Sequence, residues 1–419
     1  MRRRSIGFVL LASVVAGLAV AASAASGARA PTRSLTPDTR FLVPPPNQAG
    51  VQQAVGLLRA GQVRNALLVG ALLAKPHAVW VTKGSPTDAR NAVRSAAALA
   101  DIERAVPVLV AYDIPGRDCG GFSAGGAQTT SDYKAWIDGF ATGLGNHKAV
   151  VILEPDGLGL LPSNCGGPNA SYPFTDAERY EELNYAVDRL EQQPGAIVYL
   201  DGTHSAWLNT HDIATRLVQA GVQRAQGFFL NVSNYQFTSN GVQYGTWVSK
   251  CITLVTTVDP NFDCPNQYWN GGPNNNFVGV ALSPYGQWSD GASEADLDSA
   301  GENLRLAGVA AATHFVIDTS RNGAGPWRFP AGAYPDPQDW CNPPGRGLGL
   351  PATANTGNPL VDAYLWVKVP GESDGSCNRG VPGSTTDPEW AGIVDPAAGQ
   401  WFPQQALQLA QLANPALLR

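Results

Sequence analysis

At residues 149–157 the chain reads AVVILEPDG. Residues 149–154 are predicted to form a strand, and the unbroken apolar run AVVIL within them is typical of a strand buried on both faces, as in a parallel sheet covered by helices. Pro155 cannot extend the hydrogen-bond ladder, so the strand ends there and Asp156 projects from the edge of the sheet. This stretch therefore predicts an α/β fold that carries a carboxyl group at the end of a strand.

Six further apolar, β-branched segments repeat the pattern, at 78–82, 106–113, 196–201, 227–231, 314–318 and 364–369. Helical patterns lie between or after them, at 85–105, 131–144, 175–193, 205–221, 293–308 and 402–413. Ser85 followed by Pro86, and the capping box Thr175-x-x-Glu178, mark two helix starts. Seven strands that alternate with helices leave two candidate folds, a closed β/α barrel and an open doubly wound sheet.

Composition narrows the class of protein. The chain has 419 residues, 44% hydrophobic and only 15% charged, which is the opposite of a disordered composition. The net charge is −6 and no basic cluster lies beyond the N-terminus, so we expect no nucleic-acid partner. The 11 Trp and 12 Tyr include many in polar, Gly-rich segments, where flat rings could stack on sugars.

The N-terminus has the features of a signal peptide. Arg2, Arg3 and Arg4 precede an apolar run at 8–22 and an A-x-A site at 22–24. The run is short for a membrane span of about 20 residues. We expect residues 1–24 to be removed, 25–47 to form a Pro-rich leader and 48–419 to form one catalytic domain. The mature protein would carry a net charge of −9, be secreted, lie free of the membrane and be a monomer.

All six cysteines follow the predicted cleavage site: Cys119, Cys165, Cys251, Cys264, Cys341 and Cys377. An even number in an exported protein predicts disulfides. None lies in a C-x-x-C motif and few histidines are near them, so we expect no metal site. No organic cofactor is indicated either.

Carboxylates recur directly after the predicted strands. They are Asp113, Asp118, Glu154, Asp156, Asp201, Asp318, Glu372 and Asp374. One Asp after a strand is more often a turn residue or a helix cap, but here five strands share the feature. The loops after the strands of a β/α barrel build its active site on one face. Acidic groups crowded there would repel one another, which raises the pKa of some of them.

Several stretches together resemble the characteristic blocks of glycoside hydrolase family 6. They are VLVAYDIPGRDCGGFSAGG, VILEPDGLGLL, VYLDGTHSAWL, NVSNY, VIDTSRNGAGP, DWCNPPGRGLG and LWVKVPGESDG, in that order between about residues 106 and 375. The resemblance implies a distorted, seven-stranded parallel β/α barrel, similar to a TIM barrel, in a single domain. It also implies cleavage of β-1,4-glucan chains, such as cellulose and cello-oligosaccharides, with inversion and without a cofactor.

The resemblance also implies roles for individual residues. Asp156 resembles the catalytic acid, and Asp118 resembles the Asp that raises the pKa of that acid and helps to move protons. Asp374 resembles the proposed base, although a water chain could relay the proton instead. Tyr112 resembles the residue that distorts the sugar ring, and Asp201 lies where the family has another acidic group. Six positions resemble sugar-binding residues: His204, Trp207, Asn231, Trp340, Lys368 and Glu372.

The cysteine pairing is likewise implied by the resemblance for two bridges, Cys119–Cys165 and Cys341–Cys377. The remaining pair, Cys251 and Cys264, would form a third bridge that closes a surface loop. Arg117 could pair with a carboxylate, and Lys368 with two nearby acids could hold a water and a sugar hydroxyl.

Several alternatives remain at this stage. The blocks favour an endoglucanase, but the long segment 234–275 and the insertion 380–399 could act as lids, as in a cellobiohydrolase. A glucan-binding protein without activity is a second alternative. A third is a serine esterase, because Gly121-Phe122-Ser123-Ala124-Gly125 matches G-x-S-x-G. That motif needs Ser on a tight turn directly between a strand and a helix, and here it lies in a Gly-rich loop.

Overall fold

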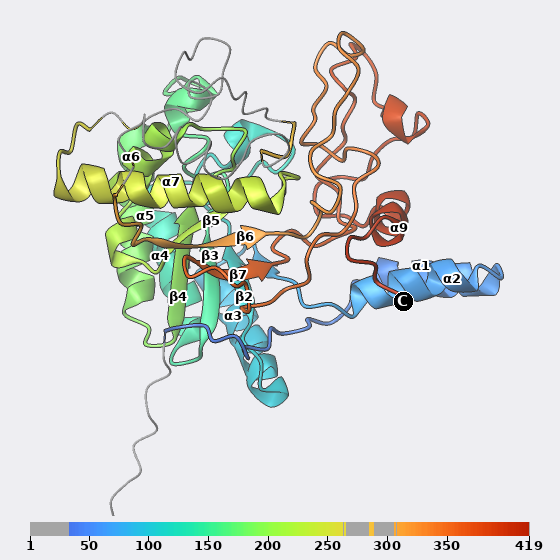
Figure 1. The fold of residues 1–419 in the computed structure, drawn as a ribbon, viewed down its shortest axis with the longest axis horizontal. Coiled ribbons are helices and arrows are strands. Elements are labelled where there is room, and N and C mark those ends of the chain that lie inside the picture. Colours follow the sequence, from blue (N-terminus) through green and yellow to red (C-terminus); the bar gives the residue numbers. More distant parts are fainter. Residues whose placement is uncertain (1–32, 263, 265–284, 289–305, 307, 419) are drawn as a thin grey trace, which may run out of the picture. The chain divides into compact units, whose positions relative to one another are not determined.

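Seven parallel strands form the centre of the fold in a computed structural model, which describes residues 33–262, 264, 285–288, 306 and 308–418 (Figure 1). Each strand pairs with the next along the chain, in the order β1-β2-β3-β4-β5-β6-β7. The strands are β1 Val79–Val81, β2 Val108–Ala111, β3 Ala149–Leu153, β4 Ala196–Asp201, β5 Gly227–Leu230, β6 His314–Asp318 and β7 Val361–Leu365.

The two edge strands approach each other, which makes the sheet a distorted barrel rather than an open doubly wound sheet. The Ala78 N–H, just before β1, donates to the Trp366 carbonyl, just after β7, at 2.9 Å. The Trp80 indole donates to the Val367 carbonyl at 2.8 Å. The predicted seven-stranded parallel barrel is therefore confirmed, and all described residues belong to one compact unit at 31–419.

Side chains alternate along each strand between two cores, as the period of two in a strand requires. In β3, Val150 and Ile152 point into the barrel, while Val151 and Leu153 face the surrounding helices. Both sets are buried, which explains why the strand sequences are apolar without a break.

Eight α-helices lie among the described residues (Figure 1). Neighbouring pairs pack together: α3 with α4, α4 with α5, and α6 with α7, while α1 and α2 form a hairpin beside α9. Their bounds are α1 Gln48–Arg59, α2 Val63–Leu73, α3 Pro86–Glu103, α4 Thr130–Leu144, α5 Asp176–Glu191, α6 Thr210–Gln219, α7 Thr238–Thr257 and α9 Pro403–Gln411.

The predicted helix starts at Ser85 and Thr175 are confirmed. Each hydroxyl accepts a hydrogen bond from the third helical N–H, at Asp88 and Glu178, and each acidic side chain accepts from the capping residue in return. These reciprocal bonds satisfy N–H groups that have no partner inside the helix.

Two boundaries differ from the prediction for local reasons. Helix α6 begins at Thr210 instead of 205, because the Asn209 side chain caps it by accepting from the Asp212 N–H at 2.8 Å. Strand β7 ends at Leu365 instead of 369, because the Asp318 carboxylate takes the N–H groups of Val367 and Lys368, two and three residues further on. The hairpin α1–α2 was not predicted.

Helix α7 occupies much of the described part of 234–275, the segment that was considered as a possible lid. Residues 238–257 form 20 residues of helix with a buried face that includes Tyr244 and Trp247. Its many Thr, Val and Gly residues have low helix propensity, but burial against the barrel outweighs propensity. The predicted helix at 293–308 and the predicted signal peptide at 1–24 fall outside the described residues, apart from 306 and 308.

Three disulfides join the predicted pairs, Cys119–Cys165, Cys251–Cys264 and Cys341–Cys377. Cys251 lies in α7 and both it and Cys264 are buried, while residues 257–261 between them are exposed, so this bridge ties a surface segment to the helix. In the predicted leader, Phe41 and Leu42 are buried, and Phe41 forms a parallel bridge with Val106.

Candidate active site

Four carboxyl groups from different strand ends form one electrostatically linked group, here called the acidic rim: Asp118, Asp156, Asp201 and Asp374. Asp156 follows β3, and the negative charges of the other three all act on it. Residues that are 38 to 218 positions away in the chain thus meet at the carboxyl edge of the sheet, as the parallel arrangement predicts.

The turn that carries Asp156 is held in a strained conformation. Glu154 and Asp156 have φ values of +52° and +65°, in the left-handed region that residues other than Gly rarely occupy. The buried Glu154 carboxylate accepts the N–H groups of Asp113 and Ile114 at 3.0–3.1 Å, which ties the end of β3 to the loop after β2. Glu154 is thus a support for the turn and not a group of the rim.

The surroundings of Asp156 favour its protonated form. Burial raises its pKa well above the usual value, and the charges of Asp201, Asp118 and Asp374 raise it further, against a smaller opposing effect of Lys368. The structure therefore gives the raised pKa that a crowded acidic rim predicts. A carboxylic acid that keeps its proton near neutral pH has the property that a general acid needs.

Asp201 supports the same turn from β4. Its carboxylate accepts from the N–H groups of Leu158 and Gly159, which follow Asp156, at 3.1 and 3.0 Å. Burial raises the pKa of Asp201 to about 6, although these hydrogen bonds oppose the shift. Asp201 therefore fixes the Asp156 turn and also disfavours ionisation of Asp156.

Asp118 lies in the loop after β2, beside the Cys119–Cys165 disulfide. It has a φ of +57°, and its carboxylate accepts from the Ser123 N–H at 2.6 Å. Burial raises its pKa in spite of this bond and of the Arg117 charge. Asp118 is consequently a better proton acceptor than an ordinary exposed carboxylate.

Arg117 does not form the carboxylate pair that was predicted for it. Its guanidinium donates to the carbonyls of Thr82 at 2.6 Å and Ser123 at 2.8 Å, and also to that of Tyr112. It lies 4.6 Å from the centre of the Tyr112 ring. Arg117 therefore anchors the loop on backbone groups and fixes the Tyr112 ring, because its five donors suit several carbonyls at once.

Asp374 is the most strongly bound carboxylate of the rim. It pairs with Arg321 at 2.8 Å and Lys368 at 3.1 Å, and accepts from the Tyr235 hydroxyl at 3.1 Å and the Asn342 N–H at 3.0 Å. Burial by itself would raise its pKa, but Arg321, Lys368 and the hydrogen bonds lower it to about 2. Asp374 is therefore ionised where Asp156 is protonated.

Sequence reasoning missed three of these partners: Arg321, Tyr235 and Asn342. Arg321 is fully buried and its guanidinium also lies 4.4 Å from the centre of the Tyr235 ring. Its block, VIDTSRNGAGP, was noticed, but one Arg in a loop carries no sign of its distant partner. Lys368, predicted to bind sugar, lies against Asp374 and also donates to the Ser373 carbonyl at 3.0 Å.

The predicted sugar-binding rings differ in exposure. Trp340 is 44% exposed and tilts against Phe122, which is 41% exposed, with 6.0 Å between ring centres. Phe122 also lies against Gly375, where a Cβ atom would approach its ring within 2.4 Å, so the loop after β2 meets the loop after β7 beside Asp374. Phe122 was not predicted as a site residue. Its exposed ring next to Trp340 provides a flat apolar surface for a sugar.

His204 and Trp207 lie together after β4, with 5.7 Å between ring centres. Burial lowers the pKa of His204 to about 3, so its ring is neutral. Its Nδ1 accepts from the Ala206 N–H at 3.2 Å, which leaves the proton on Nε2 as a donor. Gly159 leaves room for the Trp207 ring, because a Cβ atom there would approach it within 2.4 Å.

Asn231 and Glu372 have protein partners. The Asn231 amide donates to the Asp318 carbonyl at 2.9 Å and accepts from the Gln236 N–H at 2.9 Å, and the residue is buried. These bonds hold the loop after β5 in place. Glu372 accepts from the Asn47 side chain at 3.1 Å and remains partly exposed, and burial raises its pKa.

Asp318 was expected at the rim, but its carboxylate is used by the scaffold. It accepts from the N–H groups of Ser320, Ser233, Val367 and Lys368 at 2.8–3.2 Å. One buried carboxylate thus joins the loops after β5, β6 and β7.

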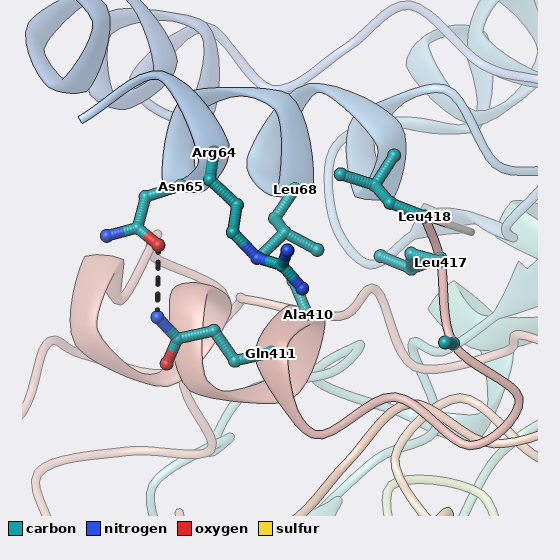
Figure 2. Close-up of a pocket in the computed structure, with 8 residues that line it drawn as sticks. Arg64, Asn65, Leu68, Ala410, Gln411, Leu417 and Leu418 are labelled. Atoms are coloured by element: carbon teal, nitrogen blue, oxygen red, sulfur yellow. Dashed lines mark hydrogen bonds between the residues drawn. The ribbon is translucent and has the colours of Figure 1, made fainter. Parts of the chain in front are cut away.

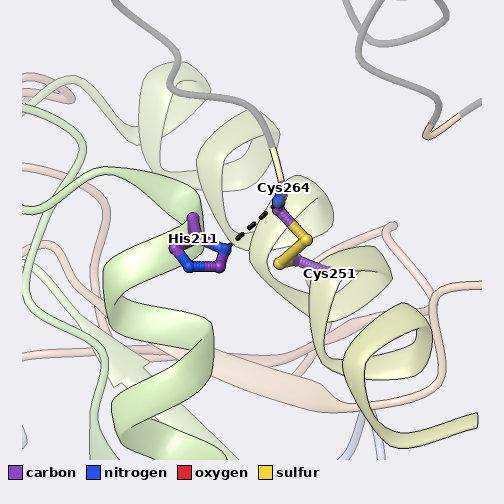
Figure 3. A group of neighbouring side chains, drawn as sticks. All are labelled: His211, Cys251 and Cys264. Atoms are coloured by element: carbon purple, nitrogen blue, oxygen red, sulfur yellow. Dashed lines mark hydrogen bonds between the residues drawn. A yellow bond between two sulfur atoms is a disulfide. The ribbon is translucent and has the colours of Figure 1, made fainter. Parts of the chain in front are cut away.

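Two groups of side chains resemble metal ligands among the described residues, but both contain a cysteine already in a disulfide. One is His211 with Cys251 and Cys264, where the Cys264 N–H donates to His211 Nδ1 at 3.1 Å (Figure 3). The other is Cys377 with Asp387 and Asp395. A metal is bound by the thiolate of a free cysteine, so neither group offers a full ligand set as it stands.

Two hollows lie away from the rim. One of about 310 Å³ lies between α2 and the C-terminal segment, where Gln411 donates to Asn65 (Figure 2). The other, of about 430 Å³, is lined by apolar residues of α1, α2 and the segment before them. Neither includes a residue of the rim.

Within the described part of the chain, no helix combines the length and apolar character needed to cross a bilayer.

Ser123 lacks the setting of an esterase nucleophile. It follows the end of β2 by 12 residues, and the next helix, α4, begins only at Thr130. Its backbone is used to bind Asp118 and Arg117. The G-x-S-x-G match is therefore a coincidence of a Gly-rich loop.

The buried carboxyls predict that stability falls as pH rises. Burial raises the folded-state pKa of four groups to about 7 or 8: Asp113, Glu154, Glu182 and Asp395. The folded protein then holds protons that the unfolded chain releases above its pKa of about 4, so stability is lost between about pH 4 and pH 8. We expect Tm to be at least about 3 °C lower at pH 8 than at pH 5.

This pH dependence is measured by thermal unfolding across that range. Glu182→Gln should flatten the curve, whereas Glu181→Gln, at an exposed position on the same helix, should leave it unchanged. A Tm that is constant or rises from pH 5 to pH 8 would contradict the raised pKa values.

Comparison with known proteins agrees with this geometry. The family model of glycosyl hydrolases family 6 matches residues 36–413. Endoglucanase A of Thermobispora bispora is 32% identical over 90% of this chain and 63% of its own length, and endoglucanase A of Cellulomonas fimi is 36% identical over 81% and 55%. The chain thus spans less than two thirds of these two relatives.

A solved structure shows the same fold. The endoglucanase Cel6 from Mycobacterium tuberculosis, in complex with methyl-cellobiosyl-4-deoxy-4-thio-β-D-cellobioside, is 32% identical, with a TM-score of 0.62. The match covers 89% of this chain and 97% of that one. With the family model matched over nearly the whole described chain, this protein belongs to glycosyl hydrolase family 6.

Proposed function

We propose that the protein is a secreted, inverting endo-β-1,4-glucanase that cleaves cellulose or a related β-glucan. One feature of the site carries the proposal: at the same rim, burial and neighbouring charges raise the pKa of Asp156 well above its usual value, while Arg321 and Lys368 lower that of Asp374 to about 2 against the effect of burial. An inverting glycosidase needs one carboxylic acid for the leaving group and one carboxylate on the water side. Family membership and the endoglucanase relatives support the choice of substrate.

In this mechanism Asp156 donates its proton to the glycosidic oxygen as the bond to the anomeric carbon breaks. A water attacks that carbon from the opposite face and loses a proton. Asp374, with a pKa of about 2, orients this water and stabilises positive charge but is a weak proton acceptor. Asp118, whose pKa is raised, is the better final acceptor through a chain of water. Tyr112 would press the sugar ring toward its distorted form.

The described parts of the two segments that resembled lids are packed against the rest of the protein, which supports endo action. Residues 238–257 are the packed helix α7, and the insertion 380–399 places Asp387, Trp390 and Asp395 in buried positions. A glucan chain could therefore bind along its length, with no need to enter from an end. Three disulfides support secretion, since such bonds persist in oxidising compartments.

The test compares loss of viscosity with release of reducing sugar on carboxymethylcellulose. Fast thinning with little sugar is the expected result, because internal cuts shorten chains quickly. Sugar release without thinning would instead indicate a cellobiohydrolase. Binding of cello-oligosaccharides without turnover would indicate a glucan-binding protein and would refute the proposed activity.

Trp340→Ala should weaken binding of the glucan with little effect on chemistry. The ring is exposed beside Phe122, and stacking of a sugar on such a ring contributes before the bond breaks. We expect KM to rise about tenfold, equivalent to about 1.4 kcal/mol, and kcat to stay within about threefold. Steady-state kinetics on soluble cellulose measures both constants. Ile102→Ala, at an exposed position on α3, is the control, and an unchanged KM in Trp340→Ala would contradict this role.

A further inference from the structure

The insertion 380–399 is attached to the interior near Asp374 by a buried ion pair. Arg379 pairs with Asp387 through two nitrogens, and neither side chain is exposed. Arg379 also donates to the Cys341 carbonyl at 2.7 Å, and the Trp390 indole donates to the Asn342 carbonyl at 2.7 Å. The insertion therefore holds the backbone at Cys341 and Asn342 in place.

Asn342 in turn holds Asp374 at two points. Its N–H donates to the Asp374 carboxylate at 3.0 Å, and its side-chain oxygen accepts from the Asp374 N–H at 2.8 Å. Asn342 is fully buried with a φ of +43°. A residue in this strained conformation stays there only when its surroundings fix it.

Asp395 completes this arrangement. Its Oδ2 accepts from the Asn342 side-chain amide at 2.9 Å, and the residue is 1% exposed. Its other oxygen, Oδ1, is buried without a hydrogen-bond partner among the described residues. Asp387 lies beside it, so a protonated Asp395 can donate to the Asp387 carboxylate.

We propose that Asp395 is a positioning residue for Asp374: its carboxyl accepts from the Asn342 amide and so fixes the residue that binds Asp374 at two points. This inference rests on the proposed function, because it assumes that Asp374 takes part in glucan hydrolysis. The segment that resembled a lid would then act from inside the protein, by fixing the carboxylate that orients the attacking water.

Charged groups surround Asp395 inside the protein. Asp387 faces it with a negative charge, and Arg379 is the cation that balances Asp387. Burial raises the pKa of Asp395 to about 7, the Asp387 charge raises it further, and the Asn342 hydrogen bond and Arg379 oppose the shift. The Asn342 amide can therefore donate to Asp395 in either protonation state, and donates more strongly to the ionised carboxylate.

The first test uses Asp395→Ala in the full-length protein. We expect kcat on soluble cellulose at pH 6, per folded molecule, to fall at least about tenfold with KM within about twofold, because the substrate-binding surface is untouched. Ser384→Ala is the matched control, since it removes a hydrogen bond inside the same insertion that does not involve Asn342. A kcat for Asp395→Ala within twofold of this control would overturn the proposal.

The second test uses Asp395→Asn, which keeps the size, an oxygen that can accept from the Asn342 amide and a donor for Asp387. We expect kcat at pH 6 within about threefold of wild type, because the acceptor for Asn342 is kept. Rescue by this variant separates the loss of the acceptor from a general effect of changing residue 395.

A kcat for Asp395→Asn at least about tenfold below wild type would overturn the proposal. If Asp395→Ala does not fold, Asp395→Leu takes its place, because Leu is similar in size and has no acceptor. The failure of the proposed function is a different result, because then the wild-type protein itself releases no sugar from soluble cellulose. An active wild type with either overturning result would refute the role of Asp395 alone.

Discussion

Asp156→Asn is expected to lower kcat on soluble cellulose by about 10³-fold, with the fold preserved. General acid catalysis contributes about 10²–10⁴-fold, and an amide cannot donate the proton that the leaving group needs. Burial and the charges of Asp201, Asp118 and Asp374 keep Asp156 neutral, so a neutral amide of equal size should fit the same turn. The measurement is reducing-sugar release together with Tm.

The matched control for this variant is Asp188→Asn, because that carboxylate lies on the exposed part of α5 and pairs with Arg224. We expect both its activity and its Tm to stay close to wild type. Near-normal activity of Asp156→Asn would refute its assignment as the acid. A large fall in Tm would show instead that the residue mainly supports the turn.

Arg321→Met should have the second-largest effect, on both stability and activity. Arg321 is fully buried, and its removal leaves the Asp374 carboxylate with a less complete set of partners. Breaking a buried ion pair from one side typically costs about 3–5 kcal/mol. We expect a clear fall in Tm and in kcat. Loss of the cation raises the pKa of Asp374 from about 2. As the pH is lowered, Asp374 in the variant therefore becomes protonated at a higher pH than in wild type.

The acid side of the kcat profile should therefore move up by about 1–3 pH units in Arg321→Met, the usual effect of an adjacent Arg on a carboxyl. The profile should be measured between pH 3 and pH 7 at a temperature at which the variant is folded. Arg328→Met, in the same connection between β6 and β7, is the control. An unchanged acid side would mean that Arg321 does not control the ionisation of Asp374.

The strands were predictable because each is a short apolar run that ends in a polar residue. Six of the seven predicted strands include the observed strand completely, and β7 alone is displaced, because Asp318 takes the N–H groups that would extend it. Helix α7 was missed because its Thr, Val and Gly residues do not favour a helix locally. Burial of its apolar face, which depends on distant residues, stabilises it.

In the candidate site, too, the residue types were predictable from the sequence but their individual roles were not. The acids after the strands were visible as residue types that follow apolar runs, and the parallel sheet requires them to meet. Their division of labour was not visible: Glu154 and Asp318 bind backbone N–H groups, whereas Asp156 stays at the rim. Nothing in the chain near Asp374 shows that Arg321, 53 positions earlier, is its partner.

The amino-acid sequence by itself determined the order of strands and helices, the carboxyl groups at the strand ends and, through its blocks, the resemblance to a hydrolase family. These depend on local hydrophobic pattern and on residue type. Only the tertiary structure decided which acid is protonated and which is ionised. The pKa of a buried group depends on burial and on charges within a few ångströms, and in this protein those charges come from distant parts of the chain.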